Sequence, residues 1–75
     1  MFARSWLKGV VQQRIIVHTI SDQSIDASLV AVMKDGIVLR AAKLLSNVGP
    51  ATAMSGEVFV PRGNIAFAQL DEAGD

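Results

Sequence analysis

The segment with most potential for chemistry is the turn Pro-Arg-Gly-Asn at residues 61–64. Arg62 stands beside Gly63, and such a pair can place a guanidinium and backbone amides against a phosphate or the edge of a base. The turn lies between two short apolar segments, residues 56–60 and 65–70. It is therefore either a nucleic-acid pocket or a joint that folds one strand back from another.

The other candidate groups stand alone. His18 is the only histidine and the chain has no cysteine, so we expect a packed or edge histidine and no metal ligand or catalytic base. Asp22 and Asp26 flank a turn, where aspartate is favoured because it bonds to its own backbone. The sequence contains no nucleophile elbow, P-loop or metal motif. We expect no enzyme and no cofactor.

Size and composition favour a domain that has partners. The chain has 75 residues, of which 51% are hydrophobic and 19% charged, with a net charge of zero. One domain of this size buries a marginal core, and without disulfides the support left to it is oligomerisation. A free nucleic-acid binder usually has a basic excess. No apolar run approaches the ~20 residues of a membrane span, and Arg4 and Lys8 interrupt any signal-peptide core. We expect the protein to be neither secreted nor bound to a membrane.

The elements that position the turn follow from hydrophobic periodicity. A helix is predicted at about residues 2–12, with Trp6 as its anchor. The period then becomes two, which predicts strands at residues 14–20, 24–33, 37–42, 57–60 and 65–70. Both faces of the first strand are apolar, so we expect both to be covered. The small residues Ala27 and Ser28 allow the second strand to bend. Residues 43–55 are the only long loop, and residues 71–75 form an acidic tail.

A short helix followed by five strongly bent antiparallel strands is mostly β and closes best as a small barrel over residues 1–70. SH3-like, OB-like and Sm-like barrels all fit this count. The order of elements and the segment SGEVFVPRGNIAFAQL resemble the Sm/LSm family, which includes bacterial Hfq. The residues that match its second motif are Gly56, Val58, Val60, Arg62, Gly63, Ile65 and Phe67. Those that match its first motif more loosely are Val17, Asp22, Leu29, Val38 and Leu39.

The resemblance implies an RNA pocket that this chain lacks in part. In RNA-binding members, the loop between the second and third strands carries a flat residue that stacks on a base and an asparagine that reads its edge. Asp35 and Gly36 stand at those positions here. Asp35 cannot stack and repels phosphate, and Gly36 has no side chain. Arg62 and Gly63 are left as a nucleic-acid or inter-subunit contact, and we discount the RNA pocket.

The resemblance also implies assembly, because Sm-like subunits pair the fourth strand of one copy with the fifth strand of the next. The strands at 57–60 and 65–70 are apolar and carry no lysine that would prevent pairing. The residues expected at an oligomer or partner interface are Trp6, Val58, Phe59, Val60, Ile65, Phe67 and Leu70.

A weaker resemblance links the segments RSWL (4–7), VHT (17–19) and VPR (60–62) to small proteins encoded among the virion genes of actinobacterial phages. It implies a minor structural component of a virion, located in the particle or in the host cytoplasm. The leading hypothesis is thus a non-enzymatic structural module that forms homo-oligomers or docks on a larger viral assembly. The alternative is an RNA-binding ring, and a peptide-binding SH3-like adaptor is a third possibility.

Overall fold

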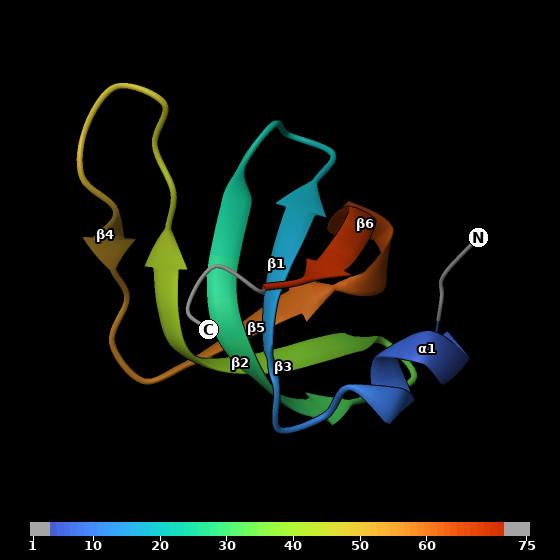
Figure 1. Ribbon diagram of the computed structural model, residues 1–75. Coiled ribbons are helices and arrows are strands. Elements are labelled where there is room, and N and C mark those ends of the chain that lie inside the picture. Colours follow the sequence, from blue (N-terminus) through green and yellow to red (C-terminus); the bar gives the residue numbers. More distant parts are fainter. Residues whose placement is uncertain (1–3, 72–75) are drawn as a thin grey trace.

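A computed structural model of the chain describes residues 4–71 (Figure 1). Over this part of the chain, one short helix precedes a single antiparallel sheet of six strands. The elements are α1 (Arg4–Gly9), β1 (Arg14–Thr19), β2 (Ser24–Val32), β3 (Gly36–Leu44), β4 (Thr52–Ala53), β5 (Glu57–Pro61), the 3-10 turn η1 (Arg62–Asn64) and β6 (Ile65–Leu70). The predicted mostly β architecture with an N-terminal helix is confirmed.

The sheet is open because its last two strands lie at different edges. The strand order is β4-β3-β2-β1-β6, and β5 pairs with β3 beside β4. β3 therefore has β2 along one side and two strands along the other: residues 36–40 pair with β5 and residues 43–44 with β4. Among the described residues, β5 pairs only with β3 and β6 only with β1. Each of these two strands has one side without a partner strand.

Irregular pairing bends the sheet around its core. The register of β2 against β3 shifts between Asp26 and Ser28 and again between Leu29 and Ala31. The first shift lies where the sequence predicted a bend at Ala27 and Ser28. β3 has one extra residue at this shift, and Ala41 there has a φ of 53°. This is the left-handed region, which is unfavourable by about 1 kcal/mol for a residue that has a Cβ. β-Bulges of this kind increase local twist and let a small sheet curl.

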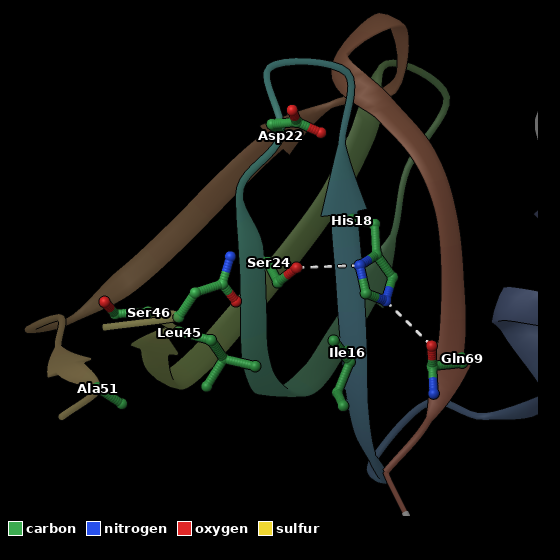
Figure 2. A pocket seen from close by; sticks show the side chains of 9 residues that line it. Ile16, His18, Asp22, Ser24, Leu45, Ser46, Ala51 and Gln69 are labelled. Atoms are coloured by element: carbon green, nitrogen blue, oxygen red, sulfur yellow. Dashed lines mark hydrogen bonds between the residues drawn. The ribbon is translucent and has the colours of Figure 1, made fainter. Parts of the chain in front are cut away.

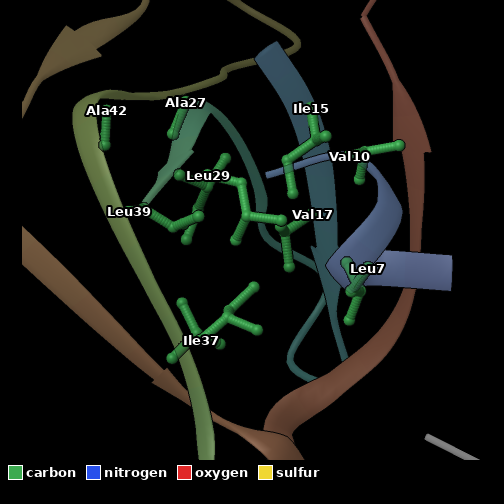
Figure 3. Packing of buried hydrophobic residues seen from close by; sticks show 11 residues of the cluster. Leu7, Val10, Ile15, Val17, Ala27, Leu29, Ile37, Leu39 and Ala42 are labelled. Carbon is green, nitrogen blue, oxygen red and sulfur yellow. The ribbon is translucent and has the colours of Figure 1, made fainter. Parts of the chain in front are cut away.

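The core fills the concave side of the bent sheet, and α1 covers one end of it (Figure 3). The buried apolar side chains are Leu7, Val10, Ile15, Val17, Ile25, Ala27, Leu29, Ile37, Leu39, Ala42 and Val60. Leu7 is 2% exposed and Trp6 is 43% exposed. Trp6 is therefore not the buried contact of the helix, and its predicted role at a partner interface stays a prediction. Leu7 on α1 and Val10, one residue after its end, make the buried contact instead.

Several predicted boundaries differ from the structure. The predicted helix at 2–12 ends at Gly9, and its residues 2–3 lie outside the described residues, as do residues 72–75 of the predicted tail. β1 is buried on one face only, and the other face is partly exposed. β3 continues to Leu44 and β4 interrupts the predicted loop, so the sheet has six strands where five were expected. A strand of two residues such as β4 is too short to show a period in the sequence.

Gly36 is the position where only glycine fits. It lies opposite Pro61 in the β3–β5 ladder, and a Cβ added there would collide with the Val60 carbonyl oxygen and approach the Phe59 ring to 2.8 Å. The β5 backbone therefore runs directly over Gly36. This close approach holds β5 against β3, and it uses the space that any side chain at residue 36 would need.

We expect Gly36→Ala to lower the free energy of unfolding by about 2 kcal/mol, because the added methyl group forces apart a β5 backbone that cannot yield like a flexible side chain. Urea unfolding followed by circular dichroism measures the change. Gly63→Ala is the matched control, since no atom lies within 4 Å of its added Cβ, and it should change stability by less than about 0.5 kcal/mol. Equal losses in both variants would contradict the close-approach explanation.

Candidate functional site

The turn that carries Arg62 lies against the hairpin between β2 and β3. The backbone N–H of Arg62 donates to the Asp35 carbonyl oxygen at 2.8 Å, and the N–H of Ile20 donates to the Asn64 carbonyl oxygen at 3.0 Å. These bonds hold η1 between two other loops. The structure thus brings Arg62 and the Asp35–Gly36 pair together, as the family resemblance implies.

The chemistry available at this turn is limited. Asp35 and Arg62 are both exposed, and Gly36 is buried under β5. An asparagine could not replace Gly36 without moving β5, so the base-reading position implied by the resemblance cannot be restored at residue 36. The φ of Gly63 is not positive, so the backbone conformation at residue 63 does not require glycine. What remains at the turn is an exposed arginine whose backbone N–H bonds to the Asp35 carbonyl oxygen.

The predicted interface residues divide between two faces. Val60 is buried, and Val58 and Ile65 pack against the core. Phe59, Phe67 and Leu70 are 49%, 57% and 36% exposed on the two edge strands. The inward-facing side chains support the barrel. The outward-facing ones, on β5 and β6, are large apolar groups in contact with solvent.

A second polar site lies on the outer face of β1, around His18 (Figure 2). The Ser24 hydroxyl bonds to Nδ1 of His18 at 2.9 Å, and Nε2 bonds to Oε1 of Gln69 at 3.0 Å. The Phe67 ring stacks on the imidazole, with ring centroids 4.2 Å apart and an interplanar angle of 22°. A hollow of about 490 Å³ opens beside these groups.

The sequence reading missed this site because His18 had no partner nearby in the sequence. Gln69 is 51 residues away and comes alongside only because β6 pairs with β1. The alternation of residues along β1 does indicate part of the site, because it places Ile16 and His18 together on the face away from Ile15 and Val17. His18 is partly buried and Phe67 stacks on its ring, as expected of a packed histidine.

A pair of carboxyl groups occupies the far end of the same face. Arg14 donates from Nη2 to Oδ1 of Asp26 at 3.0 Å and from Nη1 to the Ala41 carbonyl oxygen at 3.1 Å. Burial raises the pKa of Asp26, a hydrogen bond with Asp71 raises it further, and Arg14 opposes both effects. Asp26 thus contacts Asp71 and Arg14. Asp22 is not among the groups that act on Asp26, so the two do not form a catalytic pair of carboxylates.

Residues 4–71 offer neither a metal site nor a membrane-spanning helix. No group of three or more histidine, aspartate or glutamate side chains there could hold a metal ion. No helix in that range is long and apolar enough to cross a membrane.

Comparison with solved structures identifies the fold. No family model and no curated protein matches the sequence. The SmAP1 heptamer of P. aerophilum is similar with a TM-score of 0.79 and 15% identity, over 95% of each chain. The Pyrococcus abyssii Sm protein in complex with a uridine heptamer has a TM-score of 0.78 and 10% identity, over 89% of this chain and 94% of that one. A chain of the NatC complex bound to CoA has a TM-score of 0.76 and 25% identity, over 89% and 86%.

These similarities show that the fold is Sm-like, as the motif at residues 55–70 implied. The sheet stays open between β5 and β6, which pair with β3 and β1 and not with each other. The identities are low, so the comparisons establish the fold of this chain and leave its function to be argued from its own residues.

We expect Asp71→Asn to lower the pKa of Asp26, because it removes a neighbouring negative charge and leaves an amide that can donate to the carboxylate. Carboxyl ¹³C NMR titration measures that pKa directly. Asp22→Asn is the control, since Asp22 is not among the causes of the shift. An unchanged Asp26 pKa in Asp71→Asn would contradict the pairing of the two carboxyls.

The stability of the protein should follow the same pKa. The folded state keeps the Asp26 proton to a higher pH than the unfolded chain, whose reference value is 3.8. Folded protein then binds more protons than unfolded protein, so the free energy of unfolding falls as pH rises from 3.8 through the folded pKa. In Asp71→Asn this decrease should be smaller.

Proposed function

We propose that this chain is a non-enzymatic assembly module whose copies join head to tail into a ring. The observation that carries the proposal is the open sheet: β5 and β6 each have one side without a partner strand. Pairing β5 of one copy with β6 of the next would continue the sheet and satisfy both edges.

The side chains on the two edges support this proposal. Phe59 on β5 and Phe67 on β6 are about half exposed, and both project from the outer face of the sheet. Residues 57–70 contain no lysine, the residue that natural edge strands commonly use against unwanted pairing. Strand pairing between copies would bring apolar side chains from each edge under cover. The similar P. aerophilum SmAP1 protein is described as a heptamer.

Assembly would compensate for the small core. The buried cluster among the described residues consists of 11 side chains, two of them alanines. A domain of this size folds with a small margin, and burying two apolar edges against neighbours adds to the stability of every copy.

We expect the native protein to have a mass that is a multiple of 8.0 kDa, the mass of one chain, in native mass spectrometry. Phe59→Lys should shift it to monomer, because an ammonium group on the β5 edge resists burial against a second strand. Val48→Lys is the matched control: Val48 is 96% exposed but lies in the loop before β4. A monomeric native protein at micromolar concentration would contradict the proposal, as would equal dissociation of both variants.

RNA binding by such a ring is a second candidate function. The specific observation in its favour is the contact of the Arg62 turn with the Asp35–Gly36 hairpin, which brings together the two segments that the family resemblance assigns to RNA. A neighbour of the same fold is described in complex with a uridine heptamer. A ring would also gather one Arg62 from every copy, so that local positive charge exceeds the net charge of zero per chain.

If RNA is bound at the turn, Arg62→Ala should weaken binding of a fluorescent oligouridylate at least tenfold, and the native affinity should fall as salt rises. Fluorescence anisotropy at several salt concentrations measures both effects. Lys8→Ala, on α1, is the control for loss of a positive charge elsewhere. No salt-dependent binding by the native ring would exclude this function and leave assembly untouched.

A virion setting rests on the weaker resemblance at residues 4–7, 17–19 and 60–62. The similar structures described above are not virion proteins, so this setting stays a prediction about location. Docking in a virion would use the same unpaired sides of β5 and β6, so it is compatible with the proposed assembly.

A further inference from the structure

The Phe67 ring is supported on one side only. Its support is His18 on β1, which lies directly opposite Phe67 in the β1–β6 ladder. The two rings are stacked, with centroids 4.2 Å apart and an interplanar angle of 22°. A stack across two neighbouring strands turns the second face of the Phe67 ring away from β1, toward the side of β6 that has no partner strand. Phe67 is 57% exposed, so that second face is open to solvent.

His18 is in turn fixed by hydrogen bonds from two strands. The Ser24 hydroxyl on β2 bonds to Nδ1 at 2.9 Å, and Oε1 of Gln69 on β6 bonds to Nε2 at 3.0 Å (Figure 2). Both ring nitrogens are engaged, so rotation of the imidazole would break a bond on each side. His18 therefore gives Phe67 a flat and rigid support, which lowers the ordering cost of any contact that Phe67 makes.

The backbone hydrogen bonds show which residues can pair across the open edge of β6. The Asp71 N–H donates to a carbonyl oxygen of β1. Because bonded and non-bonded residues alternate along each side of an antiparallel strand, the backbone groups of Gln69 and Phe67 also point toward β1. Ala68 and Leu70 therefore direct their N–H and C=O groups to the open side. Both have side chains on the inner face, because they lie opposite buried residues of β1.

The open edge of β5 has the opposite arrangement. The Arg62 N–H donates to the carbonyl oxygen of Asp35, the residue before β3. By the same alternation, Val60 and Val58 bond toward β3 and Phe59 directs its N–H and C=O groups to the open side. The Phe59 side chain lies on the outer face, away from the two core-facing valines. Free backbone groups thus go with outer side chains on β5 and with inner side chains on β6.

This difference determines how two copies can pair. Residues directly opposite each other in an antiparallel ladder share both their bonding pattern and their face of the sheet. An antiparallel junction of β5 with β6 of the next copy therefore places Phe59 on the same side as Ala68 and Leu70 of that copy. On the reverse side, Phe67 of the next copy lies beside Val58. At each junction, the outer face of one copy continues as the inner face of its neighbour.

Burial of apolar surface favours this junction over a parallel one. A parallel junction would keep the two outer faces together, with Phe59 and Phe67 side by side in contact with solvent. In the antiparallel junction, each phenylalanine covers an apolar margin of the neighbouring core. Val58 and Ala68 are only partly buried and Leu70 is 36% exposed, so apolar surface remains there to be covered. Every strand pairing within residues 4–71 is also antiparallel.

We propose that His18 is the positioning residue of this junction: it holds Phe67 so that the open face of the ring packs on Val58 of the next copy. Ser24 and Gln69 act through His18, because their bonds fix the imidazole. The inference rests on the proposed assembly, to which it adds a direction of pairing and a side-chain contact.

The chain has no cysteine, so disulfide cross-linking of paired substitutions tests the junction directly. Alignment of the whole of β5 with the end of β6 sets Phe59 opposite Ala68 and Glu57 opposite Leu70. Glu57→Cys with Leu70→Cys should give a ladder of covalent oligomers on a non-reducing gel, because opposite Cα atoms lie about 5.5 Å apart, within reach of a disulfide. Glu57→Cys with Gln69→Cys is the matched control, since residue 69 lies on the other face, and it should give no ladder.

Sedimentation velocity at several concentrations tests the role of His18. His18→Ala should raise the concentration needed for assembly about fivefold, the value of one aromatic pair. His18→Phe keeps a flat ring beside Phe67 and should recover most of this loss. In a Phe67→Leu background, His18→Ala should have little further effect, whereas a general loss of stability would add to it. Circular dichroism verifies that each variant folds.

The proposal is overturned if the control pair cross-links and the Glu57–Leu70 pair does not, or if neither pair cross-links in a protein that assembles. Equal weakening by His18→Ala with Phe67 present and replaced also overturns it. In these cases the native mass is still a multiple of 8.0 kDa, so the proposed assembly stands. A native chain that is monomeric at micromolar concentration would remove both proposals.

Discussion

Strand β3 pairs with three other strands, and the remainder of the structure depends on this. It must run along β2, meet β5 with its first half and meet β4 with its last residues. A flat strand of nine residues cannot pair with these three strands and still enclose a core. The β2–β3 ladder therefore contains bulges, and Ala41 has a φ of 53°. Arg14 bonds to the carbonyl oxygen of this strained residue. One exposed side chain thus links β1, β2 and the bend of β3.

The two faces of the bent sheet differ in composition and in what they contribute to stability. The concave face holds the apolar residues and accounts for most of the stability. The outer face carries few cross-strand ion pairs, such as Arg14 with Asp26 and Arg40 with Glu57, which contribute little because they are solvated. That face is therefore able to carry specific polar groups such as His18 and Gln69 without weakening the core.

Much of the fold could be predicted from local patterns. The alternation at residues 14–20 predicts that Ile15 and Val17 share a face, and the motif at 55–70 predicts the Sm-like order of strands. The site was less predictable because its contacts are non-local: Ser24, His18 and Gln69 meet through the registers of β1 with β2 and β6. The burial of Leu7 in place of Trp6 and the collision that excludes a side chain at Gly36 likewise depend on packing distances that no sequence period encodes.

The two unpaired edges lie on the same chain at a fixed angle to each other, and the register shifts in the β2–β3 ladder contribute to that angle because β2 and β3 lie between the edges. If copies join through these edges, each added copy rotates by the same amount, and the assembly closes only when whole rotations bring the last edge to the first. A slightly different rise or twist at the bulge would turn a closed ring into an open helical filament. The twist that these register shifts give the sheet would then help determine whether growth stops.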